Sequence, residues 1–179
     1  MKKERRTIIL GGGCFWCLEA IFNSLKGVEA TPGYAGGETE NPTYQEVCKG
    51  VTGHAEVVKL IYDTKVISLE KILELFFQIH NPTTINQQGN DIGTQYRSIA
   101  FYENEEEKRI IKSAIEKAQK AWEDPIVTEI RKRADFFKAE DYHQRFYERN
   151  PSNQYCNFII RPKLAKLKEI GSKDFVLKS

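Results

Sequence analysis

The sequence predicts a single α/β domain spanning residues 1–179, and three observations lead to it. The chain has 179 residues, which suits one domain of about 100–200 residues with a core of its own. Hydrophobic residues make up 40% of it and aromatic residues 11%, which excludes an intrinsically disordered chain. Short apolar runs alternate with segments of helical periodicity, and no internal repeat or linker interrupts them.

Five short apolar runs are predicted to be strands. Glycine, proline or charged residues bound them, and several are rich in β-branched side chains, as buried strands are. In chain order the runs are Thr7–Leu10, Val28–Tyr34, Glu56–Tyr62, Ser98–Tyr102 and Ile126–Ile130.

The segments between these runs carry apolar residues at helical spacing. The predicted helices are Cys14–Phe22, Asn41–Val47, Leu69–Phe77, Asn104–Trp122, Ala139–Arg149 and a basic terminal helix from Pro162. Ser68 stands where an N-cap belongs, and Asn104 with Glu107 forms a capping-box pattern. The polar stretch Asn81–Gln95 is a long loop, and a loop of that length inside a compact domain is usually functional or disordered.

The charge of the chain is nearly balanced, because 27 basic and 25 acidic residues give +2. This balance gives no support to a nucleic-acid partner. The segment from Asn150 to Ser179 carries six basic and two acidic residues, which we interpret as a solvated helix face. No apolar run approaches the ~20 residues that span a bilayer, and no early stretch resembles a signal peptide. We therefore expect a cytoplasmic protein with no membrane partner.

The four cysteines, Cys14, Cys17, Cys48 and Cys156, are too few for a disulfide scaffold and enough for redox or metal chemistry. Cys14 follows three glycines and opens a predicted helix, where unpaired N–H groups and the helix dipole favour a thiolate. The thiolate is the nucleophilic form of cysteine, so this position predicts an activated thiol.

Other kinds of site could use the same segment. A phosphate-binding loop would need a following Gly-Lys-Ser/Thr, which is absent from the sequence. Cys14 and Cys17 supply half of a zinc site, as in a binding module without catalysis, but the Cys-x-x-Cys pair is not repeated. The residues that could complete such a site are Cys48, His54 and Cys156. A thioredoxin-like redox pair would not explain the glycine run.

Several further motifs bring polar groups to predicted strand ends, where α/β sites tend to lie. With the Gly13-Cys14-Phe15-Trp16 block they resemble the A-type peptide methionine sulfoxide reductase family, from about Thr7 to about Lys168. The matching blocks are Gly33-Tyr34-Ala35-Gly36-Gly37, Asn41-Pro42-Thr43-Tyr44, Glu46-Val47-Cys48, Gly53-His54-Ala55-Glu56, Asn81-Pro82-Thr83, Gly93-Thr94-Gln95-Tyr96-Arg97-Ser98, Tyr142-His143-Gln144 and Asn150-Pro151.

The resemblance implies a reductase that converts the S epimer of methionine sulfoxide, free or within proteins, to methionine. It implies a two-layer α/β sandwich with a ferredoxin-like core, a mixed sheet and flanking helices. It further implies that no metal and no organic cofactor is bound, and that thioredoxin or another dithiol supplies the electrons. We expect the protein to be a monomer.

The resemblance also assigns the residues of the first step. Cys14 is the nucleophile, Phe15 and Trp16 form the pocket for the S-methyl group, and Glu56 is the acid that protonates the sulfoxide oxygen. A sulfoxide sulfur is a poor electrophile until its oxygen is protonated, so a nucleophile and an acid must act together. We expect burial to raise the pKa of Glu56 and so keep its proton near neutral pH.

Three more residues take roles on the polar side of the pocket by the same resemblance. Tyr34 and Tyr96 hydrogen-bond the sulfoxide oxygen, and Asp91 helps to hold this side of the pocket. A Cys–His hydrolase would instead need His54 or His143 as a base, and sulfoxide attack needs an acid more than a base. We interpret the two histidines as structural.

The second thiol of the reaction stays open. The oxidised nucleophile is a sulfenic acid, and another thiol must condense with it. Cys17 stands where the family commonly has glycine, and Cys156 matches a family position in the tail that can perform this step. The usual glycine-rich tail around Cys156 is missing, which puts its approach to Cys14 in doubt. Cys17, Cys156 and an external thiol all remain candidates, while Cys48 is expected to be a packing residue.

Overall fold

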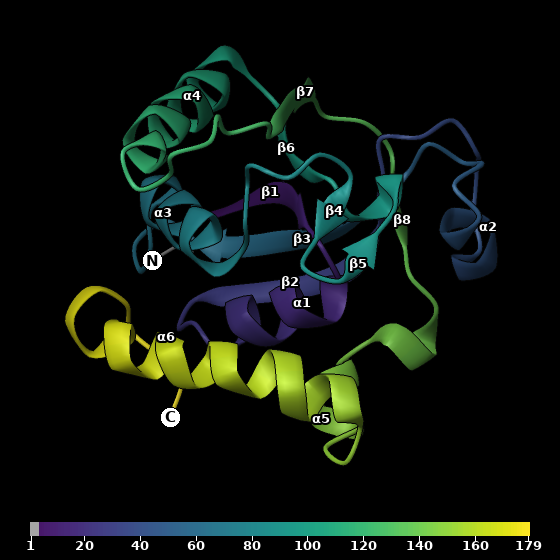
Figure 1. Ribbon diagram of the computed structural model, residues 1–179. Helices are drawn as coiled ribbons and strands as arrows, with labels where there is room; N and C mark the ends of the chain where they lie inside the picture. The colour runs from purple at the N-terminus through teal and green to yellow at the C-terminus, as the bar shows by residue number, and fades with distance from the viewer. Residues whose placement is uncertain (1–3) are drawn as a thin grey trace.

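The computed structural model describes residues 4–179, except for the side chains of residues 171–174. In this part of the chain six strands form one mixed sheet in the order β7-β6-β1-β3-β2-β8, and a separate two-stranded ribbon, β4-β5, lies beside it (Figure 1). The strands are β1 (Arg5–Gly12), β2 (Val28–Ala35), β3 (Ala55–Asp63), β4 (Gln87–Gln88), β5 (Asp91–Ile92), β6 (Ser98–Tyr102), β7 (Glu129–Lys132) and β8 (Phe136–Lys138).

The four central strands have the ferredoxin-like arrangement that the resemblance implied. Helix α1 (Phe15–Asn23) connects β1 to β2, helix α3 (Leu69–Ile79) lies between β3 and β6, and the strand order is β6-β1-β3-β2. Every neighbouring pair among these four strands is antiparallel. β7 then adds a parallel strand at one edge, and β8 adds an antiparallel strand at the other. The predicted α/β fold with a mixed sheet and flanking helices is confirmed.

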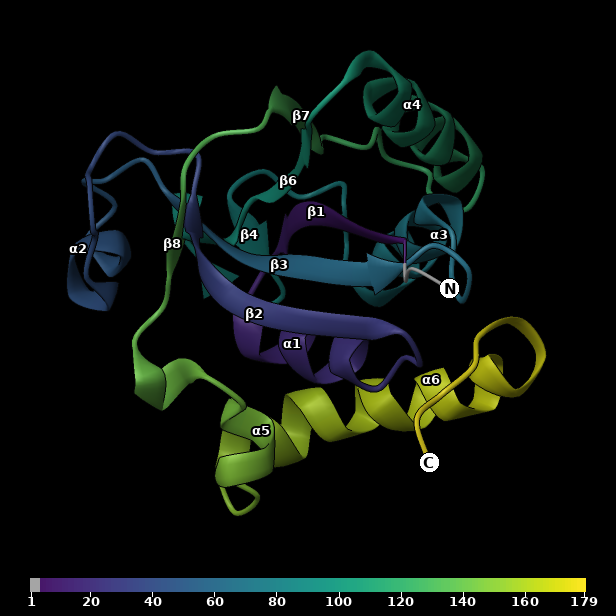
Figure 2. The same ribbon diagram turned by 180° about the vertical axis from the view of Figure 1, so that it is seen from behind.

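Most of the helices lie on one face of the sheet. The helices are α1 (Phe15–Asn23), α2 (Tyr44–Cys48), α3 (Leu69–Ile79), α4 (Glu105–Gln119), α5 (Phe146–Arg149) and α6 (Arg161–Asp174), with short 3-10 turns η1 (Thr94–Tyr96) and η2 (Asp141–His143) and a π-helical turn η3 (Cys156–Ile160). Helix α4 packs on α3, and the terminal helix α6 runs along α1 (Figure 2).

The pleat of β1 divides its side chains between two cores. Ile8 and Leu10 join the large core beneath the helices, whereas Ile9 joins a smaller cluster on the opposite face with Val57 and Phe101. Strands buried on both faces read as continuous apolar runs, and this accounts for the predicted run that β1 contains.

The predicted N-caps are confirmed, but the capping box expected at Asn104 is incomplete, because Oε2 of Glu107 accepts the N–H of Glu103 rather than that of Asn104. The Ser68 hydroxyl accepts the N–H of Lys71 at 3.2 Å at the start of α3, and Asn104 accepts the N–H of Glu107 at 2.9 Å at the start of α4. In the part of the chain that the structure describes, no helix combines the length and the apolarity that a membrane crossing requires.

Two predictions for the segment after α4 are wrong in part. The strand expected at Ile126–Ile130 begins later, at Glu129, and the edge strand β8 was not predicted. The helix expected over Ala139–Arg149 is divided into η2 and α5, because Arg145 has a left-handed backbone with φ 52°. A helix cannot continue through a residue in that conformation.

Candidate active site

Cys14 lies at the junction between β1 and α1. Gly13 makes the turn with φ 100°, and a β-carbon there would lie 2.6 Å from the side chain of Gln88. The long polar loop therefore packs directly against the turn that presents Cys14, and only glycine fits beneath it. Cys14 is the N-cap residue of α1, one position before the first helical turn in which the sequence analysis placed it.

Glu56 comes from β3 and reaches the same helix start. Its Oε1 accepts the backbone N–H of Phe15 at 3.3 Å, and its Oε2 is buried without a hydrogen-bond partner. Only 1% of the residue is exposed, and this burial raises the pKa of Glu56 to about 8. The carboxyl group is therefore protonated at neutral pH, in the direction that the sequence analysis expected.

The Cys14 thiol is not activated in the way that its position suggested. Burial raises its pKa well above the ordinary value, and a hydrogen bond to Cys17 and the negative charge of Glu56 raise it further. The N–H of Trp16 acts in the opposite direction, but it does not outweigh burial. The expectation of a thiolate at this helix start is thus wrong for the resting protein. When Glu56 is protonated, its negative charge no longer raises the pKa of Cys14, so the protonated acid also favours formation of the Cys14 thiolate.

A hydrogen-bonded chain leads from Cys17, one helical turn after Cys14, to a carboxylate. The Cys17 thiol donates to the Tyr155 hydroxyl at 3.7 Å. Tyr155 in turn donates to Oδ2 of Asp91 at 2.9 Å. The pKa of Cys17 is lowered, mainly by its hydrogen bond with Cys14 and against the effect of burial. Asp91 therefore reaches the Cys17 thiol through Tyr155.

The Tyr34 hydroxyl already has an acceptor. Tyr34 lies directly opposite Glu56 in the β2–β3 pairing, and it donates to Oε1 of Glu140 at 2.9 Å. The second oxygen of Glu140 accepts the N–H of Tyr44 at 3.1 Å, so this carboxylate fixes two elements around the site. Tyr96 belongs to η1, and burial and the charge of Glu56 raise its pKa.

Two contacts hold the Trp16 indole, a stacked ring on one of its faces and a hydrogen bond from its N–H group. The ring of Phe146 is stacked on the indole, with centroids 3.6 Å apart and an angle of 4° between the planes. The indole N–H donates to Nδ1 of His143 at 3.0 Å. Phe15 is fully buried behind them and contacts Tyr34, at 5.7 Å between the ring centroids.

Comparison with known proteins identifies the family. The family model described as peptide methionine sulfoxide reductase matches residues 6–174. The chain belongs to the peptide methionine sulfoxide reductase family. The resemblance stated from the sequence motifs is thereby confirmed.

Individual relatives agree with this membership. The peptide methionine sulfoxide reductase MsrA of Paenarthrobacter aurescens is 52% identical over 168 residues, covering 93% of this chain and 97% of the relative. The crystal structure of reduced Mxr1 from Saccharomyces cerevisiae is 36% identical, with a TM-score of 0.80, and covers 85% of this chain and 89% of its own. A structure of Mxr1 in complex with Trx2 is 26% identical, with a TM-score of 0.58, and covers 80% and 88%.

Within this family member, three of the cysteines meet in one place. Cys17 and Cys156 are buried in a small cluster with Ile160, and Cys14 packs against it. Cys48 is exposed at the end of α2, so its expected role as a packing residue is wrong. It is exposed because α2 is a short helix that buries only Val47.

The two histidines differ in how well they are satisfied. Nδ1 of His54 accepts the N–H of Gly37 at 2.9 Å and its Nε2 lies 2.7 Å from the carbonyl oxygen of Thr39, so its structural interpretation holds. His143 is bonded to Trp16 through Nδ1, but its Nε2 is buried without a partner. Among the residues that the structure describes, no group of three or more metal-ligating side chains comes together.

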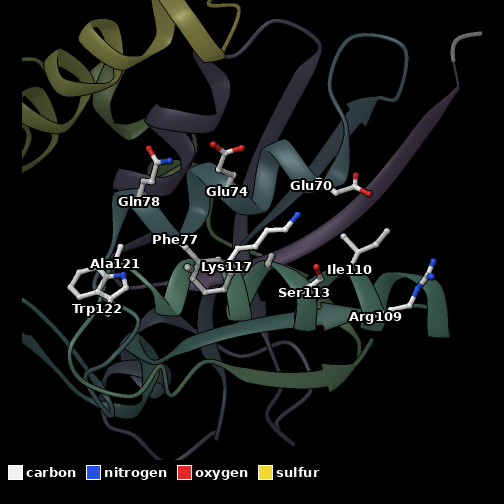
Figure 3. Close-up of a pocket in the computed structure, with 12 residues that line it drawn as sticks. Glu70, Glu74, Phe77, Gln78, Arg109, Ile110, Ser113, Lys117, Ala121 and Trp122 are labelled. Atoms are coloured by element: carbon white, nitrogen blue, oxygen red, sulfur yellow. The ribbon is translucent and has the colours of Figure 1, made fainter.

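A cavity of about 700 Å³ lies away from this site, between α3 and α4. Figure 3 shows Phe77, Lys117 and Trp122 among the residues that line it, and none of the predicted site residues belongs to the lining. The hydrogen bonds of Glu56 and Cys17, rather than this cavity, therefore indicate where the candidate active site lies.

The sequence analysis missed Glu140, Phe146 and Tyr155 as members of the site. Glu140 stands two residues before the Tyr142-His143-Gln144 block, so its closeness to a recognised motif was the available signal. Phe146 and Tyr155 come from the tail, and their contacts with Trp16 and Cys17 depend on the course of the chain after β8. No local pattern announces them.

Proposed function

We propose that this chain, taken as one domain of residues 1–179, reduces the S epimer of methionine sulfoxide, free or within proteins, and so repairs oxidised methionine. One observation carries the proposal above all others. Glu56 is a buried, protonated acid that is hydrogen-bonded to the residue next to Cys14. Sulfoxide reduction by a thiol needs this pairing, because the leaving oxygen must be protonated while the sulfur is attacked.

In the first step the Cys14 sulfur attacks the sulfoxide sulfur and the oxygen passes to Cys14. The products are methionine and a Cys14 sulfenic acid, so the substrate loses one oxygen and the cysteine gains it. Glu56 gives its proton to the sulfoxide oxygen, and the proton of the Cys14 thiol replaces it on Glu56. The low-polarity wall of Phe15 and Trp16 suits the S-methyl group.

The polar side of the pocket receives the oxygen. In this proposal Tyr34 and Tyr96 donate to it, and Tyr34 turns from Glu140 toward the substrate to do so. Methionine lacks that oxygen and would leave these donors unpaired, which favours its release. Asp91 acts beside them through its hydrogen bond from Tyr155.

We further propose that Cys17, rather than Cys156, resolves the sulfenic acid first. Cys17 lies one helical turn from Cys14, the two belong to the same cysteine cluster, and the neighbouring Cys14 thiol lowers the pKa of Cys17. Burial raises the pKa of Cys156, which is fully buried in η3. The Cys17 sulfur attacks the Cys14 sulfur, and the hydroxyl group leaves as water with the thiol proton. Cys156 packs against Cys17 and is placed for a later exchange.

A dithiol protein of the thioredoxin class then reduces the Cys14–Cys17 disulfide and becomes oxidised itself. The support is the structural relative Mxr1, which has been crystallised in complex with Trx2. Cys14 is a partly exposed residue whereas Cys17 and Cys156 are buried, so Cys14 is the cysteine of the disulfide that we expect a partner to reach first. The proposal places the enzyme in the reducing cytoplasm as a monomer with no bound metal or organic cofactor.

The test is turnover of a peptide that carries one sulfoxide epimer at a time. The wild-type protein, with thioredoxin and its reductase, should reduce the S epimer, and Cys14→Ser should abolish the reaction. Cys48→Ser is the matched control, because Cys48 is an exposed thiol outside the cysteine cluster, and it should keep wild-type turnover. Turnover of the R epimer alone, or full activity of Cys14→Ser, would overturn the proposal.

A further inference from the structure

Glu19 is a buried carboxyl group that the reaction does not use. It lies on α1, one helical turn after Trp16, and only 2% of it is exposed. Burial raises its pKa to about 7. A buried carboxyl group without a structural partner would destabilise the fold, so its hydrogen bonds define what it does.

Both oxygens of Glu19 bind the backbone of a distant segment. Oε2 accepts the N–H of Arg145 at 2.9 Å, and Oε1 accepts the N–H of Phe146 at 3.3 Å. Arg145 has the left-handed conformation that divides η2 from α5. A non-glycine residue is strained in this region, and it persists there only where the surroundings fix it. Glu19 is the side chain that fixes it.

The same segment carries the support of Trp16. Phe146, whose N–H is bound by Glu19, stacks on one face of the indole at 3.6 Å. His143, just before the break, accepts the indole N–H at 3.0 Å. Trp16 and Glu19, both on α1, thus contact the chain on the two sides of Arg145. Trp16 contacts His143 and Phe146, and Glu19 binds the backbone at Arg145 and Phe146. The backbone position that Glu19 sets is the position from which Phe146 and His143 hold the indole.

We propose that Glu19 is a positioning residue for the methyl-binding wall, which holds Phe146 against Trp16 and thereby orients the indole toward the substrate. This inference rests on the proposed function in one respect, namely that the Trp16 indole meets the S-methyl group. In this proposal Glu19 affects substrate affinity although its carboxyl group does not contact the substrate. A shift of about 1 Å in such a positioning element has large kinetic consequences.

The test compares Glu19→Ala and Glu19→Gln. Glu19→Ala loses both acceptors, and its KM for the S-epimer peptide should rise about tenfold, while the single-turnover rate at saturating substrate stays within about threefold. Glu19→Gln keeps one oxygen acceptor and should recover part of the affinity. The control is Glu107→Ala, which removes another buried carboxylate that accepts a backbone N–H, on α4. Its KM should stay at the wild-type value.

An optical measurement separates the inference from the activity. The chain has two tryptophans, so Trp122→Phe leaves Trp16 as the only indole reporter. In that background Glu19→Ala should shift and change the intensity of the Trp16 emission, and Glu107→Ala should not. If Glu19→Ala does not fold, Phe146→Ala takes its place, because it removes the stacked ring directly and should reproduce both effects.

The outcomes distinguish the two proposals. If the wild-type protein reduces neither epimer while the Trp16 emission responds to Glu19→Ala, the proposed function fails and the positioning of Trp16 stands. The positioning role is overturned if the wild-type protein turns over the S epimer normally but Glu19→Ala shows the same KM and the same Trp16 emission as Glu107→Ala. Where Glu19→Ala does not fold, Phe146→Ala is compared with Glu107→Ala in the same way.

Discussion

Oε1 of Glu56 accepts the backbone N–H of Phe15, the residue that follows Cys14, while Oε2 of the same carboxyl group is buried without a partner. Strand β3 and the start of α1 thereby place an acid and a thiol at one point. The free oxygen is the one that remains to protonate a bound substrate. Several consequences can be measured.

Replacement of Glu56 by glutamine should remove the acid and preserve the shape of the site. We expect the single-turnover rate of S-sulfoxide reduction to fall about 10²–10⁴-fold, which is the usual contribution of a general acid. Rapid-quench measurement of methionine formed per enzyme checks this, with circular dichroism to show that the fold is intact. A rate near that of the wild type would mean that Glu56 is not the acid.

The stability of the protein should depend on pH through Glu56. Its pKa is about 8 in the folded protein and 4.5 as the ordinary value, so at pH 7 the folded state holds a proton that the unfolded state has lost. The free energy of unfolding therefore falls as pH rises from 6.5 to 8, with a slope that approaches about 1.4 kcal/mol per pH unit for one proton.

Two other buried groups bear on that slope. Glu19, with a pKa of about 7, adds to it below pH 7, whereas His80, with a pKa lowered to about 4 by burial from an ordinary value of 6.5, opposes it near pH 6.5 and has little effect by pH 8. Urea unfolding at pH 6.5, 7 and 8 measures the slope, and Glu56→Gln should flatten it. Parallel curves for the two proteins would contradict a raised pKa of Glu56.

Substitution of Cys17 should stop the reaction after one turnover. In Cys17→Ser we expect one methionine per enzyme and a Cys14 sulfenic acid that persists long enough to be trapped by dimedone. Cys156→Ser should form methionine and the first disulfide at the wild-type rate, because Cys156 is buried in η3 and its pKa is raised. The reverse pattern in the two variants would assign the resolving step to Cys156.

The Tyr155 hydroxyl should matter for the second step and not for the first. This hydroxyl accepts a hydrogen bond from the Cys17 thiol and donates one to Asp91. Tyr155→Phe therefore removes the hydrogen-bonding partner of the resolving thiol. Methionine formation in a single turnover should stay within about threefold of the wild type, and loss of the second free thiol should slow about tenfold, as for one charge-assisted hydrogen bond. An equal effect on both steps would place Tyr155 in the substrate pocket instead.

The parts of the fold that local pattern determines could be predicted. The runs that became β1, β2, β3 and β6 are apolar because the sheet buries them, and Ser68 and Asn104 cap their helices through contacts three residues away. The Gly13–Trp16 block placed the nucleophile because its turn, thiol and aromatic wall are consecutive in the chain.

The remaining features depend on partners far away in the sequence. Phe136–Lys138 forms a strand because Gly33–Ala35 presents a sheet edge, and the break at Arg145 exists because Glu19, 126 residues earlier, binds its N–H. The raised pKa of Cys14 follows from burial, which a helix start in isolation does not reveal. Cys48 looked like a packing residue because free cysteines usually are, and only the short course of α2 exposes it.

The most direct test is mass spectrometry of the protein after one equivalent of the S-epimer sulfoxide, without added reductant. The account predicts one equivalent of methionine and a disulfide that joins Cys14 to Cys17, with Cys48 and Cys156 still alkylatable after unfolding. A Cys14 that remains a free thiol after methionine has formed, or a disulfide that joins Cys14 to Cys48, would contradict it.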